Sequence, residues 1–125
     1  MVLPGNYLRK QDIAKLKSAD AKTKLALHSK IDERTDRLIR KAIVQAGLPI
    51  HLAQNARIEW RRVGYWHGCE RVDRFFVPKH LRKFPRLHVR IQFRDENGRL
   101  LHLPGPLVLG GGRFYGLGLF AVDRP

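Results

Sequence analysis

The stretch RLHVRIQF, at positions 86–93, alternates apolar and polar residues over its whole length. Leu87, Val89, Ile91 and Phe93 fall on one side of an extended chain, and basic or polar residues fall on the other. This period of two predicts a β-strand that buries one face. The strand decides the fold class, because a sheet with one apolar face needs helices or a second sheet to cover it.

Helical patterns precede this strand. Positions 32–49 predict an amphipathic helix that Gly47 and Pro49 end. The charged face of this helix is expected to be solvated and consists of Arg37, Arg40 and Lys41. The opposite face is apolar and consists of Leu38, Ile39, Ala42, Ile43 and Ala46. Positions 6–31 are rich in Lys and Ala and predict a helix with a poor apolar stripe. That segment is either a solvated leader or a helix that a partner surface orders.

Further strands are expected on both sides of positions 86–93. ARIEWRRVGYW (56–66) alternates, DENG (95–98) is a turn that makes RLLHL (99–103) a hairpin partner, and GLFAV (118–122) is a last short strand. Helices followed by strands and a glycine-rich crossover predict an α+β plait, with helices on one face of an antiparallel sheet. No first strand is evident ahead of residue 32.

The composition favours a polyanionic partner. Lys and Arg number 25 against 11 Asp and Glu, which gives a formal net charge of +14. Nucleic acid is the first partner class that such a charge indicates, and an anionic membrane surface is the second. No membrane partner is expected, because the sequence has no run of about 18 apolar residues. The single cysteine, Cys69, fits a reducing cytoplasm.

Metal and nucleotide cofactors are not expected. The sequence has no HxH, HExxH or CxxC pattern and no dense acidic cluster that could hold a metal ion. The glycine stretch GPLVLGGGRFYGLGLF (105–120) lacks the GxxxxGK[ST] and GxGxxG patterns of ATP and dinucleotide sites. Its glycines either let backbone amides approach a phosphate or permit a tight bend and close packing, the latter above all at Gly116 and Gly118.

Three stretches resemble the CRISPR-associated RAMP superfamily. They are AGLP with RIEW (46–60), FFVPKHLRKFPRLHVRIQF (75–93) and GPLVLGGGRFYGLGLF. Together they resemble the C-terminal, repeat-processing half of the fused subunit of type I-U (I-G) interference complexes. The resemblance implies a ferredoxin-like, RRM-related domain at 32–125 that holds CRISPR RNA, preceded by a basic helical leader or partner-binding segment at 1–31.

The chain departs from that family pattern in two ways. A complete ferredoxin-like domain has a strand ahead of its first helix, and the chain lacks the N-terminal half of the fused subunit. Either another polypeptide supplies the first strand, or the chain is a trimmed or separately encoded piece whose sheet edge awaits a partner.

The resemblance also implies a reaction, in which a metal-independent endoribonuclease lets the 2′-hydroxyl of the RNA attack the adjacent phosphodiester. Histidine suits the required base and acid because its pKa lies near neutrality. His67, in GYWHGCER, and His80, in VPKHLRK, are the candidates. The alternative for each is an ordinary surface histidine, in a loop or in a basic patch.

The candidate RNA contacts are the glycine-rich loop and the basic residues before and within the central strand: Gly110, Gly111, Gly112, Arg113 and Gly116, with Lys79, Arg82, Lys83, Arg86 and Arg90. Interleaved aromatic residues could stack on bases, although at least half of them are needed for the core. The sequence thus predicts a CRISPR RNA repeat-binding and processing module that retains the 3′ hairpin within a larger complex. The alternatives are a non-catalytic structural RNA-binding subunit and, on charge alone, a DNA-binding architectural protein.

Overall fold

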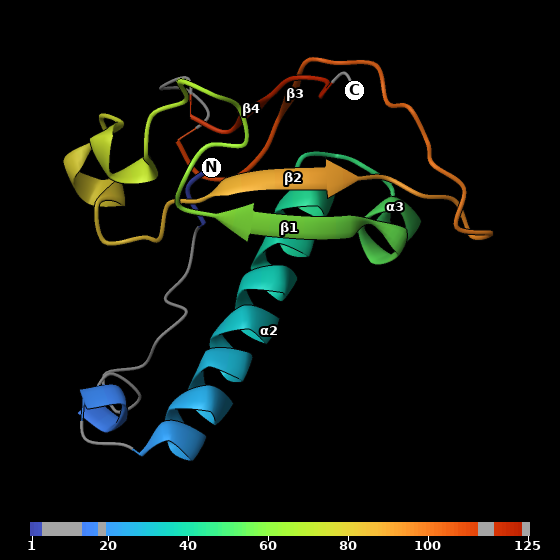
Figure 1. Ribbon diagram of the computed structural model, residues 1–125. Coiled ribbons are helices and arrows are strands. Elements are labelled where there is room, and N and C mark those ends of the chain that lie inside the picture. Colours follow the sequence, from blue (N-terminus) through green and yellow to red (C-terminus); the bar gives the residue numbers. More distant parts are fainter. Residues whose placement is uncertain (4–13, 18–19, 113–116, 124–125) are drawn as a thin grey trace.

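The structure, a computed structural model, describes residues 1–3, 14–17, 20–112 and 117–123. Residues 14–17 are helical, and the other described helices and strands are as follows (Figure 1): α2 (Ala21–Gln45), α3 (Ile50–Asn55), β1 (Arg57–Arg61), η1 (Val72–Arg74), η2 (Lys79–Leu81), β2 (His88–Gln92), β3 (Leu107–Val108) and β4 (Leu119–Phe120). The predicted α+β class with antiparallel strands is confirmed.

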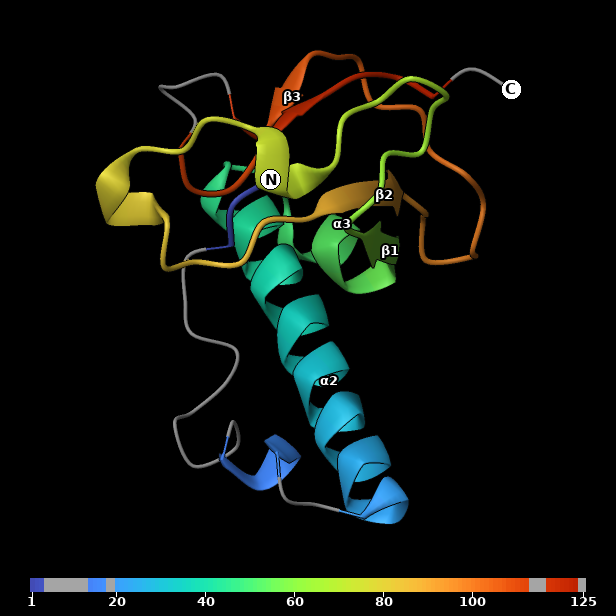
Figure 2. The same ribbon diagram turned by 60° about the vertical axis from the view of Figure 1, so that its left-hand side comes forward.

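Helix α2 is a single helix of 25 residues that crosses the predicted boundary at residue 32. Asp20 caps its start, since the carboxylate accepts a hydrogen bond from the Thr23 N–H at 2.9 Å. Its end is as predicted, with Gly47 in the left-handed region at φ 90°. The first turns of α2 project away from the strands, and only its C-terminal half lies beside them (Figures 1 and 2).

Strands β1 and β2 pair antiparallel and confirm the predicted alternation. Ile58 lies opposite Ile91, and Trp60 lies opposite Val89. These four side chains pack against the core cluster that includes Ile39 and Ile43 of α2. The core face of the strands therefore meets α2, whereas the basic and polar residues between them face the other way.

The predicted turn at 95–98 is also present. The Asp95 carboxylate accepts hydrogen bonds from the N–H groups of Asn97 at 2.9 Å and Arg99 at 2.8 Å. Arg94 and Leu100 form an isolated antiparallel bridge beyond it. The last predicted strand is observed as β4, which pairs with β3 in a second two-stranded sheet.

An extended segment at the N-terminus, Met1–Leu3, connects the two sheets. Val2 forms antiparallel bridges with Arg86 on one side and Gly111 on the other. The Val2 and Leu3 side chains are buried, with exposed fractions of 1% and 0%. Met1–Leu3 and β1 are joined through α2 and have β2 between them, which is the arrangement of a split β-α-β unit. This segment occupies the place of the first strand, which the sequence does not reveal.

The α-amino group of Met1 makes the stability of this 125-residue chain depend on pH. Burial lowers the pKa of this group from 8.0 to about 6. Between those pH values the unfolded chain binds more protons, so the free energy of unfolding should rise with pH by roughly 2–3 kcal/mol. Urea titrations from pH 5 to 9 measure this change. A chain acetylated at Met1 should lack this component, and equal pH dependence of the two chains would contradict the prediction.

Arg40 is half-buried and bound within the protein, contrary to the expectation that the charged face of α2 is solvated. Its Nε and Nη2 atoms bind the two carboxylate oxygens of Asp36 at 2.7 and 3.1 Å. Its Nη1 atom donates to the carbonyl oxygens of Ala53, Gln54 and Ala56 at 2.5, 3.1 and 3.1 Å. Helix α3 ends with carbonyls that have no partner within the helix, and the guanidinium satisfies them. Arg40 therefore fixes α3 against α2.

Replacing Arg40 by alanine should lower the free energy of unfolding by about 2–3 kcal/mol, because charged hydrogen bonds to buried or half-buried carbonyls are lost. Arg37 is the matched control, since it lies one turn earlier on the same helix and is exposed. Its replacement by alanine should change stability by less than about 0.5 kcal/mol. Chemical denaturation measures both values, and equal losses would show that the Arg40 contacts do not stabilise the fold.

Candidate nucleic-acid interface

The predicted glycine-rich loop lies directly against Met1–Leu3. The Gly111 N–H donates to the Val2 carbonyl at 2.9 Å, so that amide is satisfied within the protein. A Cβ atom on Gly110 would lie 2.7 Å from the same carbonyl oxygen. Gly110 and Gly112 have φ values of 84° and 78°, a backbone conformation that residues with a Cβ atom rarely adopt. Glycine is thus needed here for close backbone approach. The predicted contacts Arg113 and Gly116 lie outside the described residues.

The same loop lies beside the predicted basic segment. Cβ atoms on Gly111 and Gly112 would lie 3.9 and 3.1 Å from the Leu81 side chain of η2. Leu81 is buried with Val2 and Val77 in a small second core cluster. The basic residues and the histidine around Leu81 are exposed: Lys79, His80, Arg82 and Lys83. We call these four residues and Gly110–Gly112 the basic corner. The structure therefore brings together two sets of predicted contacts that are about 30 positions apart in the sequence.

Arg86 and Arg90, two further predicted contacts, bind within the protein. Arg86 donates to the Phe75 carbonyl at 3.4 Å. Arg90 lies on β2, forms an ion pair with Asp123 at 2.8 Å, and places its guanidinium 4.5 Å from the centre of the Tyr65 ring. Both arginines are half-buried, so any contact with RNA requires these interactions to be shared or exchanged.

Asp123 joins β2 to the loop that follows β1. Its Oδ1 atom accepts a hydrogen bond from the Trp66 indole at 2.9 Å, while Oδ2 binds Arg90. The Trp66 hydrogen bond, followed by Arg90, lowers the pKa of this carboxyl, which is therefore ionised at neutral pH. Sequence reasoning does not select Asp123, because an isolated acidic residue near the end of a basic chain carries no pattern.

Tyr65 lies between two arginines. Arg61 places its guanidinium 4.0 Å from the ring centre, and Arg90 also contacts the ring. Burial raises the pKa of the Tyr65 phenol, although both arginines act in the opposite direction. The phenol is thus neutral and protonated at neutral pH, as a hydrogen-bond donor must be.

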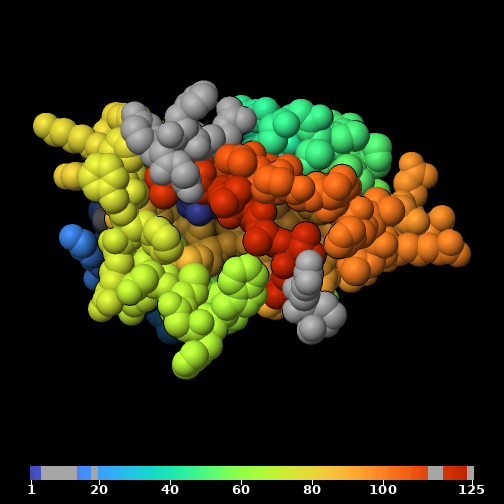
Figure 3. All heavy atoms as spheres, turned by 90° about the horizontal axis from the view of Figure 1, so that it is seen from above, coloured from blue at the N-terminus to red at the C-terminus, as the bar shows by residue number. Residues whose placement is uncertain are grey.

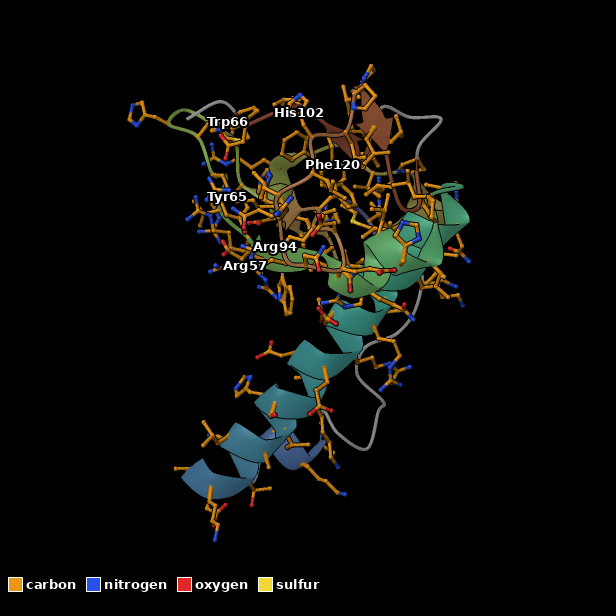
Figure 4. All side chains as sticks on the ribbon, turned by 90° about the vertical axis from the view of Figure 1, so that its right-hand side faces the viewer. Arg57, Tyr65, Trp66, Arg94, His102 and Phe120 are labelled. Atoms are coloured by element: carbon orange, nitrogen blue, oxygen red, sulfur yellow. The ribbon has the colours of Figure 1, made fainter. Side chains whose placement is uncertain are left out.

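A cleft of about 860 Å³ lies between β2 and the C-terminal segment. Residues 86–93 line one side of it and residues 117–123 line another. The molecule is hollowed here in Figure 3, between the yellow-green loop after β1 and the red C-terminal segment. In Figure 4, Tyr65 and Trp66 lie on the loop at one side, and Phe120 lies above the level of Arg57 and Arg94.

The candidate histidines lie on different segments. His67 is exposed in the loop between β1 and η1, and His80 is exposed within η2 at the basic corner. His88, on the polar side of β2, binds the Glu70 carbonyl through Nε2 at 2.8 Å and packs edge-on against Phe75. His67 and His80 are therefore accessible from solvent, as proton transfer to a bound polymer requires, whereas His88 is held by its neighbours.

Fewer aromatic residues than expected belong to the core, since of the six only Trp60 and Phe84 pack on the core clusters. Trp60, Tyr65 and Phe84 are half-buried. Trp66, Phe75 and Phe76 have exposed fractions of 54%, 43% and 76%. The exposed three are available for base stacking.

Within residues 1–3, 14–17, 20–112 and 117–123, no group of three His, Cys, Asp or Glu residues could hold a metal ion. No helix within these ranges is both long enough and apolar enough to cross a membrane.

Comparison with known proteins identifies one family. No curated protein and no solved structure matches the chain. A family model described as CRISPR-associated protein, GSU0054 family, matches residues 2–122. That match covers the basic corner, nearly all of the core and all of the cleft lining except Met1 and Asp123. The chain belongs to the GSU0054 family of CRISPR-associated proteins.

Proposed function

We propose that this protein binds the repeat hairpin of CRISPR RNA and cuts precursor RNA beside it without a metal ion. In this proposal the chain is a ferredoxin-like RAMP domain, related to the repeat-processing half of the fused subunit of type I-U complexes. Its partners are the RNA, which it retains through the 3′ hairpin after cleavage, and other subunits of an interference complex. The membership of a CRISPR-associated family makes RNA the first polyanion to consider for a chain of charge +14.

The basic corner is the observation that carries the proposal. Leu81 packs against Gly111 and Gly112, so the exposed Lys79, Arg82 and Lys83 belong to the segment that lies beside the glycine-rich loop. The glycines let Met1–Leu3 and η2 pack closely on this loop, because Val2, Leu81 and Leu117 occupy the places that side chains at Gly110 and Gly112 would take. Lysine and arginine at the rim would neutralise several phosphates and make binding strongly dependent on salt.

The proposed reaction needs one base, one acid and positive charge. The base removes the proton from the RNA 2′-hydroxyl, whose oxygen forms a bond to the adjacent phosphorus. The bond from phosphorus to the 5′-oxygen then breaks, and the acid protonates that leaving oxygen. The products are a 2′,3′-cyclic phosphate and a 5′-hydroxyl end. Lys79, Arg82 and Lys83 would stabilise the extra negative charge on the phosphoryl oxygens in the transition state. His80 is nearest in the chain to these cations, and His67 is the second candidate.

A non-catalytic RNA-binding subunit is the second candidate function. Two observations favour it: His67 and His80 belong to different segments, and the Gly111 amide is already bonded to Val2. A scaffold needs only the cations and the exposed aromatic residues.

The deciding experiment incubates the protein with labelled repeat RNA in the presence of EDTA and resolves the products by length and 3′ end. A single cut at the base of the hairpin with a cyclic phosphate supports the endoribonuclease. Tight, salt-sensitive binding without a cut supports the structural subunit. A preference for duplex DNA over the RNA hairpin at equal salt would overturn both and support a DNA-binding architectural protein.

A further inference from the structure

One edge of β2 has backbone groups that lack hydrogen-bond partners in the part of the chain that the structure describes. Peptide groups along a strand alternate between its two edges. Leu87 exchanges hydrogen bonds with Met1 at 2.9 and 3.0 Å, and the Phe93 carbonyl accepts one from Leu101 at 2.8 Å. Val89 and Ile91 have the same phase, so their N–H and C=O groups point toward the cleft. Among the described residues, no segment offers these four groups a backbone hydrogen bond.

The opposite side of the cleft is a second strand edge. Strand β4 uses one of its edges for β3, and the adjoining Gly118 carbonyl accepts a hydrogen bond from Leu109 at 2.9 Å. Because peptide groups alternate along a strand, the N–H and C=O groups of Leu119 and Ala121 point to the other edge, away from β3. The cleft is lined by consecutive residues on both sides, 86–93 on one and 117–123 on the other. Consecutive lining residues are expected where a strand presents its edge, and not one of its faces, to a cleft.

Met1–Leu3 already fills one end of this space. Val2 bridges Arg86 and Gly111 at once, so a single extended segment fits between the two sheets at that point. We propose that the cleft is a strand acceptor, into which an extended segment of a partner polypeptide inserts in line with Met1–Leu3 and antiparallel to β2. The segment pairs with Val89 and Ile91 by β-strand addition.

The lining of the cleft fits a polypeptide better than a nucleic acid. Its arginines already bind within the protein through a terminal nitrogen each, Arg86 to the Phe75 carbonyl and Arg90 to Asp123. The ionised Asp123 carboxylate repels phosphate. By contrast, Leu101, Leu103 and Phe120 give the wall an apolar character that suits alternating apolar side chains.

The register fixes the pattern of the inserted strand. Met1 packs against the main core cluster and Leu3 is buried within it, whereas Val2 packs on Val77 and Leu81 on the other face. Residues opposite Val89 and Ile91 therefore face α2 and should be apolar. The residues between them face the side of Tyr65 and Trp66.

The free chain provides the first test, by amide hydrogen exchange. The amides of His88, Arg90 and Gln92 point toward β1 and should exchange slowly. Those of Val89 and Ile91 should exchange at least about tenfold faster within the same strand. Equal protection of all five amides would overturn the proposal, because it would show that the edge is already paired.

The second test fills the cleft with a strand of known sequence. A Thr-Val-Thr-Val-Thr extension joined to Met1 places its valines opposite Val89 and Ile91. It should slow exchange of those two amides at least about tenfold and raise Tm by roughly 5 °C or more. A Thr-Pro-Thr-Pro-Thr extension is the control, since proline removes the two N–H groups that would pair with β2.

Identical behaviour of the two extensions would overturn the proposal. So would protection of Val89 and Ile91 by repeat RNA in the free chain without protection by the valine extension, because the cleft would then be a nucleotide site. The proposal goes beyond RNA processing and stands apart from it, since the exchange experiments give the same result whether or not the protein cuts RNA.

Discussion

The Gly118→Ala variant is expected to lose roughly 3–5 kcal/mol of folding stability, with a fall in Tm of roughly 10–20 °C. A Cβ atom at Gly118 would lie 1.9 Å from the Leu109 carbonyl oxygen, which no contact in a folded protein tolerates. The φ value of 76° adds strain for any residue with a side chain. The Leu109 backbone cannot move away, because the Leu109 side chain is fully buried in the main core. Thermal and urea unfolding followed by circular dichroism measure the loss.

Gly98→Ala is the matched control for backbone strain. Gly98 has a φ value of 80°, but nothing lies within 4 Å of the Cβ position. Its replacement should cost about 1 kcal/mol, the penalty of the left-handed conformation alone. The difference between the two variants isolates the contact with Leu109. If Gly118→Ala is no less stable than Gly98→Ala, close packing is not the reason for glycine at position 118.

Patterns of some length in the sequence predict their elements correctly. The alternation at 86–93 gives β2 and its core face, the Asp95 side chain gives the turn, and Gly47 gives the end of α2. Each depends on neighbours in the chain, so local chemistry is sufficient. The start of α2 is missed because the apolar stripe is weak there and the cap at Asp20 lies outside the recognised pattern.

Features that depend on distant residues are not visible in the sequence. Met1–Leu3 is too short to show a period of two, and its place in the sheet comes from pairing with Arg86 and Gly111. In the sequence Arg40 belongs to the charged face of its helix and is expected to be solvated. Its hydrogen bonds to carbonyl groups at the end of α3 depend on how α3 packs against α2. The basic corner is predicted only in part. The sequence shows both the basic segment at 79–83 and the glycine-rich loop, but not the packing of Leu81 on that loop, which brings the two together.

Alanine replacements of the two histidines have the largest expected effect on function. In the proposed endoribonuclease, His80→Ala should lower the rate of repeat cleavage by about 10²–10⁴-fold, because a positioned acid or base contributes that factor. His67→Ala should do the same if it supplies the second proton transfer. Both residues are exposed, so neither replacement creates a cavity, and Tm should change little. Single-turnover cleavage of labelled repeat RNA in EDTA, with binding measured in parallel, gives the two quantities.

The control is His51→Ala, an exposed histidine on α3 that is outside both the basic corner and the cleft. It should leave cleavage and binding unchanged. Loss of cleavage with binding kept within about threefold identifies a proton-transfer role, since lysine and arginine supply most of the phosphate neutralisation. Equal losses of cleavage and binding for His80→Ala would instead assign this residue to the phosphate-binding surface. If neither variant slows a cut that the unaltered protein makes, the acid and base must be other groups, and the Tyr65 phenol, which burial keeps protonated, is then the next residue to replace.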